Sequence, residues 1–477
     1  MITGAFLGLD LGGTGAKAGV YDGKGNLLGF GHASYSPLTT EDGHADIPVE
    51  EIYSAARNAA ISAISAGGVD VCAMAVSSQG QTFVSIDGDG TPLHPAIMWY
   101  DSRARDEAQY LRENLTPASD SSPTPHIEGI TPAAKIIWLR SRYPDLMRRA
   151  RKYLLLPDYI AWKMTGEAVT DPTTASSTGF YADDAPGYSR DAMFVAGVNE
   201  DQLARIQASG SVIGRIRPEI AADWGLSADA ILVTGANDQY CGALGAGVCR
   251  SGIASETSGT CLALVTLAER LPDHLPTTIS TGRFPIPRYR FFLAYEKDCG
   301  LVLDRFRREA CPGKSFAELD AEATQFPLIG DGITTGSEVS AFFGGKFGSS
   351  VRNTPSRIYR SMLVSLSFSL REYADLMRSC GLLFDTIRCI GGGAKSNLWL
   401  QIKADVTGLA IERPKVTESA TLGAAILARV GVLEDLSIEE CSSAIYHTDC
   451  VFEPNRHMRD FYEDAYASCR EVARITE

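Results

Sequence analysis

The chain lacks the features that mark an exported or membrane protein. No stretch reaches the roughly 20 consecutive apolar residues that a bilayer-spanning helix needs. The first residues lack a basic segment, a long apolar run and a cleavage site, so we expect no signal peptide. The eleven cysteines are scattered without a CxxC pair, and the seven histidines form no HExxH motif. We therefore expect a cytoplasmic protein with reduced thiols, and neither a disulfide framework nor a zinc site.

Acidic residues outnumber basic ones, 58 to 44. The formal net charge is −14, and no basic tract or RNP-type aromatic motif offsets it, which argues against nucleic acid as a partner. Hydrophobic residues make up 45% and charged residues 21%, which is typical of a globular protein. Because 477 residues exceed one ordinary core, we expect two domains of roughly 200 to 250 residues each.

Strands alternate with helices along the chain, which predicts an α/β fold. The first half is expected to hold strands at Ala5–Asp10, Ala16–Asp22, Leu27–Tyr35 and Val71–Ser77, and a helix from Pro48 to about Ala66. In the second half, Ser255–Leu267 repeats the opening pattern of strand, Gly-Thr turn and strand. A helix is expected at Thr354–Met377, because Ile358, Met362, Leu366 and Leu370 recur every four residues. A strand at Thr386–Ile390 is expected after it.

The repeat places a domain boundary near Gly247–Ser251, and we divide the chain into domains 1–248 and 249–477. The turn of each half contains glycine followed by threonine. Two related halves that face each other across a cleft would bring both turns to one place.

The first candidate for chemistry is the segment DLGGTGAK, which begins at Asp10. Its glycines let backbone N–H groups approach a polyanion, while Thr14 adds a hydroxyl and Lys17 a cation. Asp10 is an acceptor suited to hydrated Mg²⁺. A plain hairpin turn explains the segment equally well when it is taken alone. Its recurrence at Gly259–Thr260 favours phosphate binding.

Two further segments place polar groups where a strand meets a helix. In GANDQYCGALGAG, Asp238 follows a strand and stands at a helix start, where it could act as a general base on a hydroxyl or simply cap the helix. In GGGAKSN, three glycines from Gly391 to Gly393 could let a purine and its ribose lie on the backbone, or could form a tight strand–helix turn.

Together these segments resemble the FGGY family of carbohydrate kinases, which has the two-domain, actin-like ATPase fold related to ribonuclease H. The resemblance covers nearly the whole chain, with seven matches in the family's order. Beyond the four segments above, the matches are IEGITPAAKIIWLRSRYP at Ile127–Pro144, DYIAWKMTGEAVTDPTTASST at Asp158–Thr178, and ATLGAAILA at Ala420–Ala428.

The resemblance implies transfer of the γ-phosphate of ATP to a hydroxyl of a small sugar. Asp238 would take the proton from the attacking hydroxyl, and Asp10 would hold Mg²⁺ through water. Contacts to the ATP phosphates are implied for Thr14, Lys17, Gly259 and Thr260. Gly392, Gly393 and Asn397 would border the adenosine. The N-terminal half would hold the sugar, and the C-terminal half most of the nucleotide.

The sugar side departs from the family pattern. Where xylulose kinases carry Met-His and glycerol kinases Arg-Glu, this chain has Gly80-Gln81, and Gln81 could bind a sugar hydroxyl. Trp99 and Asp101, in MWYDSRA, are similar to the ketose-kinase branch, although Trp99 could equally be a core residue. The tract Phe342–Pro355 replaces a GERxP segment of many members.

We therefore expect a kinase for a ketose such as xylulose, with glycerol or another polyol as the alternative acceptor. A non-catalytic, actin-like ATP-binding protein is the alternative from another class, but it would lack the segment Asp158–Thr178. A sugar-responsive regulator would need a DNA-binding helix-turn-helix, for which neither terminus has room or charge. The expected partners are the sugar and MgATP, and a homodimer is the candidate assembly.

Overall fold

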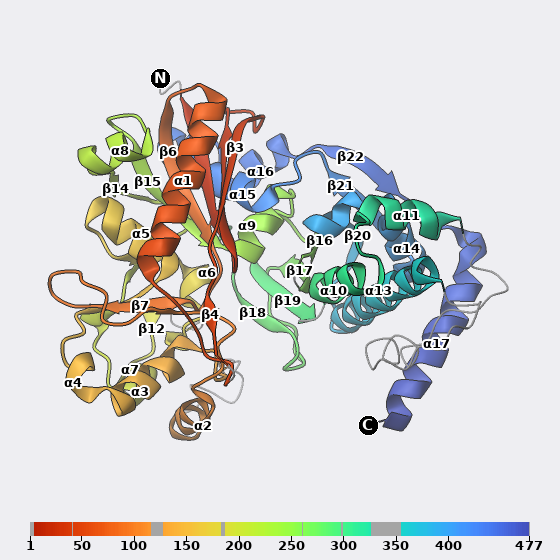
Figure 1. Cartoon of the computed structure of the whole chain (residues 1–477), viewed down its shortest axis with the longest axis horizontal. Helices are drawn as coiled ribbons and strands as arrows, with labels where there is room; N and C mark the ends of the chain where they lie inside the picture. Colours follow the sequence, from red (N-terminus) through yellow and green to blue (C-terminus); the bar gives the residue numbers. More distant parts are fainter. Residues whose placement is uncertain are drawn as a thin grey trace. The chain divides into compact units, whose positions relative to one another are not determined.

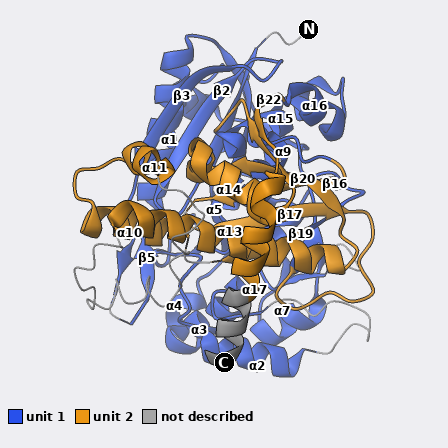
Figure 2. Ribbon diagram, turned by 90° about the vertical axis from the view of Figure 1, so that its right-hand side faces the viewer, with its two compact units in different colours: residues 1–249, 280–291, 418–446 blue, residues 250–279, 292–417, 447–477 orange. Residues whose placement is uncertain are grey.

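The structure, a computed structural model, describes residues 4–40, 42–115, 127–182, 187–259, 261–296, 299–325 and 354–476. These residues form two compact units, which Figure 2 colours separately. The first unit comprises residues 1–249, 280–291 and 418–446, and the second comprises 250–279, 292–417 and 447–477. Residues 280–291 and 418–446, which lie inside the expected domain 249–477, are thus part of the first unit.

A six-stranded sheet forms the centre of the first unit, in the order β14-β15-β6-β1-β2-β3. Its strands are β1 (Ala5–Leu11), β2 (Gly15–Tyr21), β3 (Leu27–Ser34), β6 (Val71–Ser78), β14 (Val212–Arg215) and β15 (Ile231–Asn237). Strand β6 runs parallel to β1, and β15 runs parallel to β6. The carboxyl ends of these three strands therefore lie at one edge of the sheet, which is where open α/β sheets bind ligands.

Helices α1 (Val49–Gly67) and α15 (Ser419–Leu433) cover opposite faces of this sheet, and Figure 1 shows α1 against it. Leu7 of β1 shares a buried core with the apolar residues of α1. Because successive strand residues point to opposite faces, Gly8 points away from that core. A Cβ atom on Gly8 would lie 1.7 Å from the Thr421 carbonyl oxygen. The glycine therefore lets α15 pack directly on β1.

A smaller sheet completes the first unit, in the order β4-β5-β8-β7-β9. Its strands are β4 (Leu38–Thr39), β5 (Ala45–Ile47), β7 (Phe83–Ile86), β8 (Ala96–Ile97) and β9 (Lys152–Leu155). The other helices of this unit are α2 (Arg105–Asn114), α3 (Pro132–Arg142), α4 (Pro144–Met147), α5 (Leu156–Thr165), α6 (Pro172–Ala175), α7 (Arg190–Ala196), α8 (Pro218–Trp224), α9 (Asp238–Gly245) and α16 (Ile438–Ile445). Short strands lie at β10 (Val169–Thr170), β11 (Tyr181–Ala182), β12 (Gly187–Tyr188), β13 (Arg205–Ile206) and β18 (Ser280–Arg283).

The strands of the second unit pair in the order β19-β17-β16-β20-β21-β22, within a seven-stranded sheet. Its strands are β16 (Gly252–Ser258), β17 (Leu262–Ala268), β19 (Arg290–Glu296), β20 (Phe384–Ile390), β21 (Ala410–Pro414) and β22 (Thr448–Phe452). The helices of this unit are α10 (Gly300–Ala310), α11 (Phe316–Thr324), α13 (Pro355–Ser379), α14 (Asn397–Thr407) and α17 (Arg459–Thr476).

The two sheets repeat one pattern of strand pairing. In the first, β1 pairs antiparallel with β2 and parallel with β6, and β15 is parallel to β6 and antiparallel to β14. In the second, β16 pairs antiparallel with β17 and parallel with β20, and β21 is parallel to β20 and antiparallel to β22. The α/β fold and the recurrence of the opening hairpin are therefore confirmed.

The predicted loop at Ser119–Pro125 and most of the tract Phe342–Pro355 lie outside the described residues. In the part of the chain that the structure describes, no helix is long and apolar enough to cross a membrane.

Candidate active site

The first glycine turn joins β1 to β2. Gly12 donates its N–H to the Gly15 carbonyl at 3.0 Å, which closes the turn. Thr14 is exposed, and its carbonyl oxygen accepts the N–H of Tyr35 at 3.1 Å. The backbone N–H groups of Gly13 and Thr14 donate to no described residue. They are therefore available to an anion, as the sequence predicts for this turn.

Asp10 lies near the carboxyl end of β1, beside this turn. It is in register with Lys17 on β2 and with Ser77 on β6. Burial raises the pKa of Asp10, whereas the Ser77 hydrogen bond and the Lys17 charge oppose that rise. The Ser77 hydroxyl donates to one carboxylate oxygen, Oδ1, at 2.7 Å. The carboxylate is thus held at one oxygen, while the other accepts from no described residue.

Lys17, a predicted phosphate ligand, is paired with a carboxylate of its own unit. Its Nζ donates to Glu418 Oε2 at 2.9 Å. The Lys17 side chain is 45% exposed and the Glu418 side chain 25% exposed. Such an ion pair contributes only about 0–1 kcal/mol to stability, so exchange of Glu418 for a phosphate group would cost little.

Asp238 begins α9 directly after β15. The register places Asn237 of β15 opposite Ser78 of β6, and Ser78 in turn lies opposite Leu11, the neighbour of Asp10. Asp238 and Asp10 therefore lie at the same edge of the sheet. The pKa of Asp238 is raised to about 7, first by burial and then by the negative charge of Asp10. A carboxylate with such a pKa is suited to accept a proton near neutral pH.

A hydrogen-bond chain that the sequence did not reveal holds the residue before Asp238. The Thr173 hydroxyl accepts the Asn237 N–H at 2.9 Å and itself donates to Asp171. Asp171 also accepts the backbone N–H groups of Thr173 at 2.8 Å and Thr174 at 3.2 Å. The segment around these residues was recognised only as similar to a family motif. Its structural effect is to fix the backbone on which Asp238 stands.

Gly80 and Gln81 follow β6, at the same edge of the sheet. A Cβ atom on Gly80 would lie 2.9 Å from Ser177 Oγ and 3.0 Å from Asn237 Nδ2, so a side chain there would displace both. Gln81 has a φ of 68°, in the left-handed region that residues other than glycine rarely adopt. Backbone strain of this kind often occurs at functional sites.

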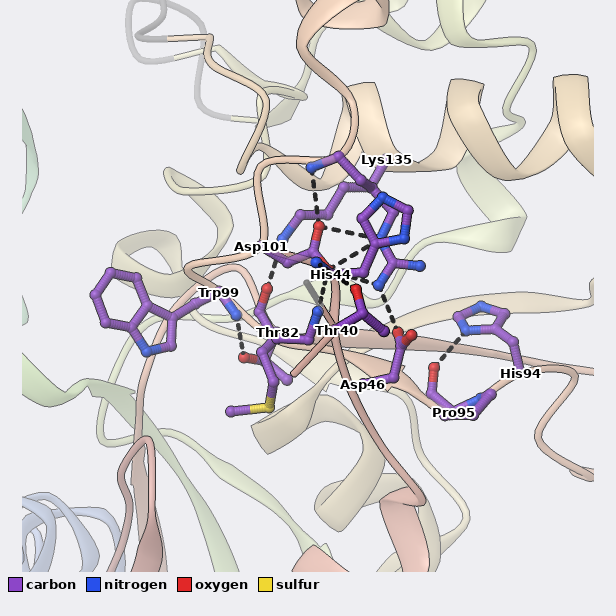
Figure 3. Close-up of polar contacts among 12 residues, drawn as sticks. Thr40, His44, Asp46, Thr82, His94, Pro95, Trp99, Asp101 and Lys135 are labelled. Carbon is purple, nitrogen blue, oxygen red and sulfur yellow. Dashed lines mark hydrogen bonds and ion pairs between the residues drawn. The ribbon is translucent and has the colours of Figure 1, made fainter. Parts of the chain in front are cut away.

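Trp99 lies beside the first glycine turn. A Cβ atom on Gly13 would be 3.5 Å from the indole Nε1. The ring is only half-buried, so Trp99 is not a closed core residue. Its backbone N–H donates to Thr82 Oγ1 at 2.8 Å, and the preceding carbonyl, of Met98, accepts from the buried Lys135 Nζ at 2.8 Å (Figure 3).

Asp101, the other residue predicted on the sugar side, is fully buried, with 0% exposure. Its Oδ2 accepts the Ala45 N–H at 2.6 Å and the Arg103 Nε–H at 2.9 Å, and Arg103 also bonds Asp46 at 2.7 Å (Figure 3). Burial would raise the pKa of Asp101, but the hydrogen bonds from Arg103 and Ala45 lower it below its usual value. Because its oxygens are already occupied, a direct bond from Asp101 to a sugar would have to displace these partners.

In the second unit, Gly259 follows β16 as predicted for the second glycine turn. Its N–H donates to the Cys261 carbonyl at 3.0 Å, and its carbonyl accepts the Gly300 N–H at 2.9 Å. Thr260 lies outside the described residues.

The glycines predicted near the adenosine lie against the end of β16. A Cβ atom on Gly392 would be 3.7 Å from the Ser258 carbonyl oxygen, and one on Gly393 would be 2.4 Å from the Ser258 Cβ. The second glycine turn and this glycine loop are thus neighbours within the second unit. Asn397 begins α14, and its Oδ1 accepts from Arg413 at 2.6 Å.

A buried ion pair that the sequence did not reveal lies beneath these loops. Lys403 of α14 and Glu256 of β16 are both 0% exposed, and Lys403 Nζ donates to Glu256 Oε2 at 2.6 Å. Lys403 also donates to the Ser258 hydroxyl, which in turn donates to Glu256. These bonds tie the end of β16, next to Gly259, to α14.

The predicted metal site rests on Asp10 alone. Among residues whose placement is described, no group of three or more His, Cys, Asp or Glu side chains could hold an ion. A single carboxylate with one oxygen free fits Mg²⁺, because Mg²⁺ keeps several waters and is usually bound by one or two carboxylates together with substrate phosphates.

Comparison with known proteins assigns the family. Residues 5–245 match the N-terminal domain, and residues 337–432 the C-terminal domain, of the FGGY family of carbohydrate kinases. A xylulose kinase of Staphylococcus epidermidis is 25% identical over 100% of this chain and 98% of its own. A glycerol kinase of Solidesulfovibrio magneticus is 27% identical over 95% of each chain, and an autoinducer-2 kinase of Klebsiella pneumoniae is 25% identical over 98% of this chain and 93% of its own.

Solved structures show the same fold. A ligand-bound xylulose kinase of Lactobacillus acidophilus superposes with a TM-score of 0.85 at 20% identity, covering 99% of this chain and 98% of its own. A gluconate kinase of the same organism gives a TM-score of 0.86 at 20% identity with the same coverage. Kinases of this family use ATP. This chain belongs to the FGGY family of carbohydrate kinases and is a phosphotransferase with an alcohol group as acceptor.

Proposed function

We propose that this kinase transfers the γ-phosphate of MgATP to a hydroxyl of a small ketose such as xylulose. The observation that carries the proposal is the position of Asp238, at the same sheet edge as Asp10 and with its pKa raised to about 7. The names of several full-length relatives, which are xylulose kinases, support the choice of acceptor.

In the proposed reaction, Asp238 accepts the proton of the attacking hydroxyl. The hydroxyl oxygen forms a bond to the γ-phosphorus while the bond to the bridging oxygen breaks, and ADP leaves with that electron pair. Phosphoryl transfer depends mainly on positioning and charge stabilisation, so one carboxylate beside the nucleophile is sufficient acid–base chemistry. The hydrogen bond from Asn237 to Thr173 supports this role because it fixes the backbone before Asp238.

Each unit has its own proposed nucleotide ligands. In the first, the free N–H groups of the first glycine turn support a role in phosphate binding. In the second, the contact of Gly392 and Gly393 with the end of β16 supports a shared role with Gly259. The proposed phosphate ligands are Thr14, Lys17, Gly259 and Thr260, and the proposed adenosine neighbours are Gly392, Gly393 and Asn397.

Asp10 is the proposed residue for Mg²⁺, held through its free oxygen and water. The ion would supply positive charge that stabilises the phosphate oxygens during transfer. The Ser77 hydroxyl would keep the Asp10 carboxylate oriented.

The proposed sugar contacts are Gln81, Trp99 and Asp238. Asp101 is proposed to act on the sugar site through Arg103 and the strand β8, because both its oxygens accept hydrogen bonds from Arg103. Glycerol or another polyol remains the second candidate acceptor. It is favoured by the 27% identical glycerol kinase. Gly80 does not decide between the two acceptors, because it matches neither the Met nor the Arg of the two resembled branches.

A substrate panel tests the proposal. ADP release and sugar phosphate formation would be measured for pentuloses, hexuloses, gluconate, glycerol and tetritols. We expect the largest kcat/KM for a pentulose. A larger kcat/KM for glycerol or a tetritol would show that the acceptor is a polyol and not a ketose. That result would not bear on the role of Asp238, which variants of Asp238 test.

A further inference from the structure

Gln79 has a buried side-chain amide without a partner among the described residues. It follows β6 directly, and its side chain is 3% exposed. Neither Oε1 nor Nε2 is hydrogen-bonded to any residue in the described parts of the chain. Buried polar groups are nearly always hydrogen-bonded, because an unmatched donor or acceptor loses its water without replacement. The amide therefore calls for a partner that none of the described residues supplies.

The backbone ties Gln79 to the first glycine turn. Its N–H donates to the Leu11 carbonyl at 2.9 Å, one residue before the turn starts. The side-chain amide also lies over this turn, because a Cβ atom on Gly13 would be 3.9 Å from Gln79 Oε1. The same hypothetical atom would be 3.5 Å from Trp99 Nε1. The absence of a side chain at Gly13 therefore leaves the amide and the indole N–H facing one space.

The groups around this space are the Trp99 indole N–H, the backbone N–H groups of Gly13 and Thr14, and the Gln79 amide, none of which donates to a described residue. The atom of the amide that lies over Gly13 is the acceptor Oε1. Because neither Oε1 nor Nε2 has a described partner, a half-turn of the amide brings the donor Nε2 to this space without breaking a hydrogen bond. Several unpaired N–H donors around one space form a site for a multiply charged oxyanion such as a phosphoryl group. A sugar hydroxyl would be a poorer match, because it can accept few of these bonds.

We propose that the Gln79 amide donates a hydrogen bond to the phosphoryl group during its transfer. The proposal rests on the proposed function, because it assumes that the first glycine turn receives the phosphoryl group. It does not depend on which acceptor is phosphorylated. Gln79 stabilises charge on the phosphoryl oxygens, while Asp238 accepts the proton, so the two residues act on different atoms of the same reaction.

The central variant is Gln79→Met, which keeps the length of the side chain and removes the amide. We expect kcat to fall ~10²- to 10³-fold, as for loss of one donor to a transition-state oxyanion. The KM values for ATP and for the acceptor should change little. The affinity for MgADP with aluminium fluoride and acceptor should fall by the same factor as kcat, whereas the affinity for MgADP alone should not.

The melting temperature of the free enzyme separates this role from a structural one. Because the amide has no partner among the described residues, Gln79→Met should leave the melting temperature unchanged or raise it. Gln79→Asn shortens the side chain by one methylene group and so moves the amide away from the turn. This variant should lose activity but keep its affinity for MgADP. Gln207→Met is the matched control. Gln207 lies in the same unit, its Oε1 is also buried without a partner, and kcat should stay within about twofold.

Three results would overturn the proposal. The first is a kcat of Gln79→Met within about twofold of wild type. The second is a rise in the acceptor KM with kcat unchanged, which would place Gln79 on the sugar instead. The third is a parallel loss of melting temperature and MgADP affinity, which would make Gln79 a support of the loop. If Asp238→Asn stays active while Gln79→Met does not, Asp238 is not the general base, but the proposed hydrogen bond from Gln79 to the phosphoryl group is still supported.

Discussion

The charge of Asp10 raises the pKa of Asp238, which together with burial brings that pKa to about 7. The two residues stand at the ends of β1 and β15, on either side of β6 in one sheet. A raised pKa makes Asp238 a better proton acceptor, since an ordinary Asp, with a pKa near 3.8, would hold a proton too weakly.

Asp10→Asn should therefore lower the pKa of Asp238. The substitution removes the negative charge and leaves burial in place, so the pKa should fall without returning to the ordinary value. Carboxyl ¹³C NMR titration of the free enzyme, with the signal assigned by its absence in Asp238→Asn, measures this shift. Asp89→Asn, at an exposed turn, is the control and should leave the pKa unchanged. An unchanged or higher pKa in Asp10→Asn would contradict the coupling.

Asp238→Asn should stabilise the fold at alkaline pH. With a folded-state pKa raised above the unfolded value, ionisation of Asp238 costs stability progressively as pH rises from about 3.8 to about 7, and fully above that. The melting temperature of the variant should exceed that of wild type most at pH 8, and the difference should shrink toward pH 4. A difference in melting temperature that grows toward low pH would contradict a raised pKa of Asp238 in the folded protein.

Gly80→Ala should reduce activity by displacing the neighbours of the sugar site. Its Cβ would press on Ser177 and Asn237, and Asn237 precedes Asp238. A small shift of the base is expected to lower kcat by ~10- to 100-fold. Gly88→Ala is the matched control, because a Cβ there meets nothing within 4 Å. Equal activity of the two variants would show that the contact at Gly80 does not constrain the base.

Thr173→Val should lower both stability and kcat. The valine removes the hydroxyl that accepts the Asn237 N–H and leaves that N–H unpaired. Asp171 Oδ1 loses one donor but keeps the backbone N–H groups of Thr173 and Thr174. Loss of such a buried bond costs about 1–3 kcal/mol in the free energy of unfolding. Chemical denaturation and steady-state kinetics would measure the two effects. Thr173→Ser keeps the hydroxyl and should restore both, and failure of this rescue would indicate that the methyl group matters instead.

Lys403→Met should strongly destabilise the protein. The substitution leaves Glu256 buried and uncompensated, which costs about 3–5 kcal/mol in the free energy of unfolding. The double variant Glu256→Gln with Lys403→Met should recover part of the loss, because it removes the unpaired charge. Arg305→Ala breaks an exposed pair with Glu309 in the same unit and should cost less than about 1 kcal/mol. Similar losses at Lys403 and Arg305 would contradict the burial argument.

Local patterns made much of the fold predictable. Alternating apolar residues on both sides of a glycine turn predict a hairpin, as at β1 and β2. The four-residue recurrence from Ile358 to Leu370 predicts the long helix α13. Asp238 was recognisable because a strand, a glycine and an asparagine precede it, a pattern that places a carboxylate where a strand meets a helix.

Long-range packing was not predictable from the same patterns. Residues 418–446 belong to the first unit because Gly8 admits α15 against β1, a contact between residues more than 400 positions apart in sequence. The bond from Asn237 to Thr173 spans 64 positions, and the pair of Lys403 with Glu256 spans 147. The sequence suggested that Asp101 could bind a sugar, because sequence alone does not show that the Arg103 side chain donates hydrogen bonds to both Asp101 oxygens.

The most direct test of the account is single-turnover phosphorylation by Asp238→Asn at pH 8, with the best acceptor from the substrate panel. The account predicts that formation of the sugar phosphate falls by at least ~10²-fold, the range expected for loss of a general base, while MgATP binds with nearly wild-type affinity. Sugar phosphate formed at a rate near that of wild type would contradict the central claim that Asp238 accepts the proton.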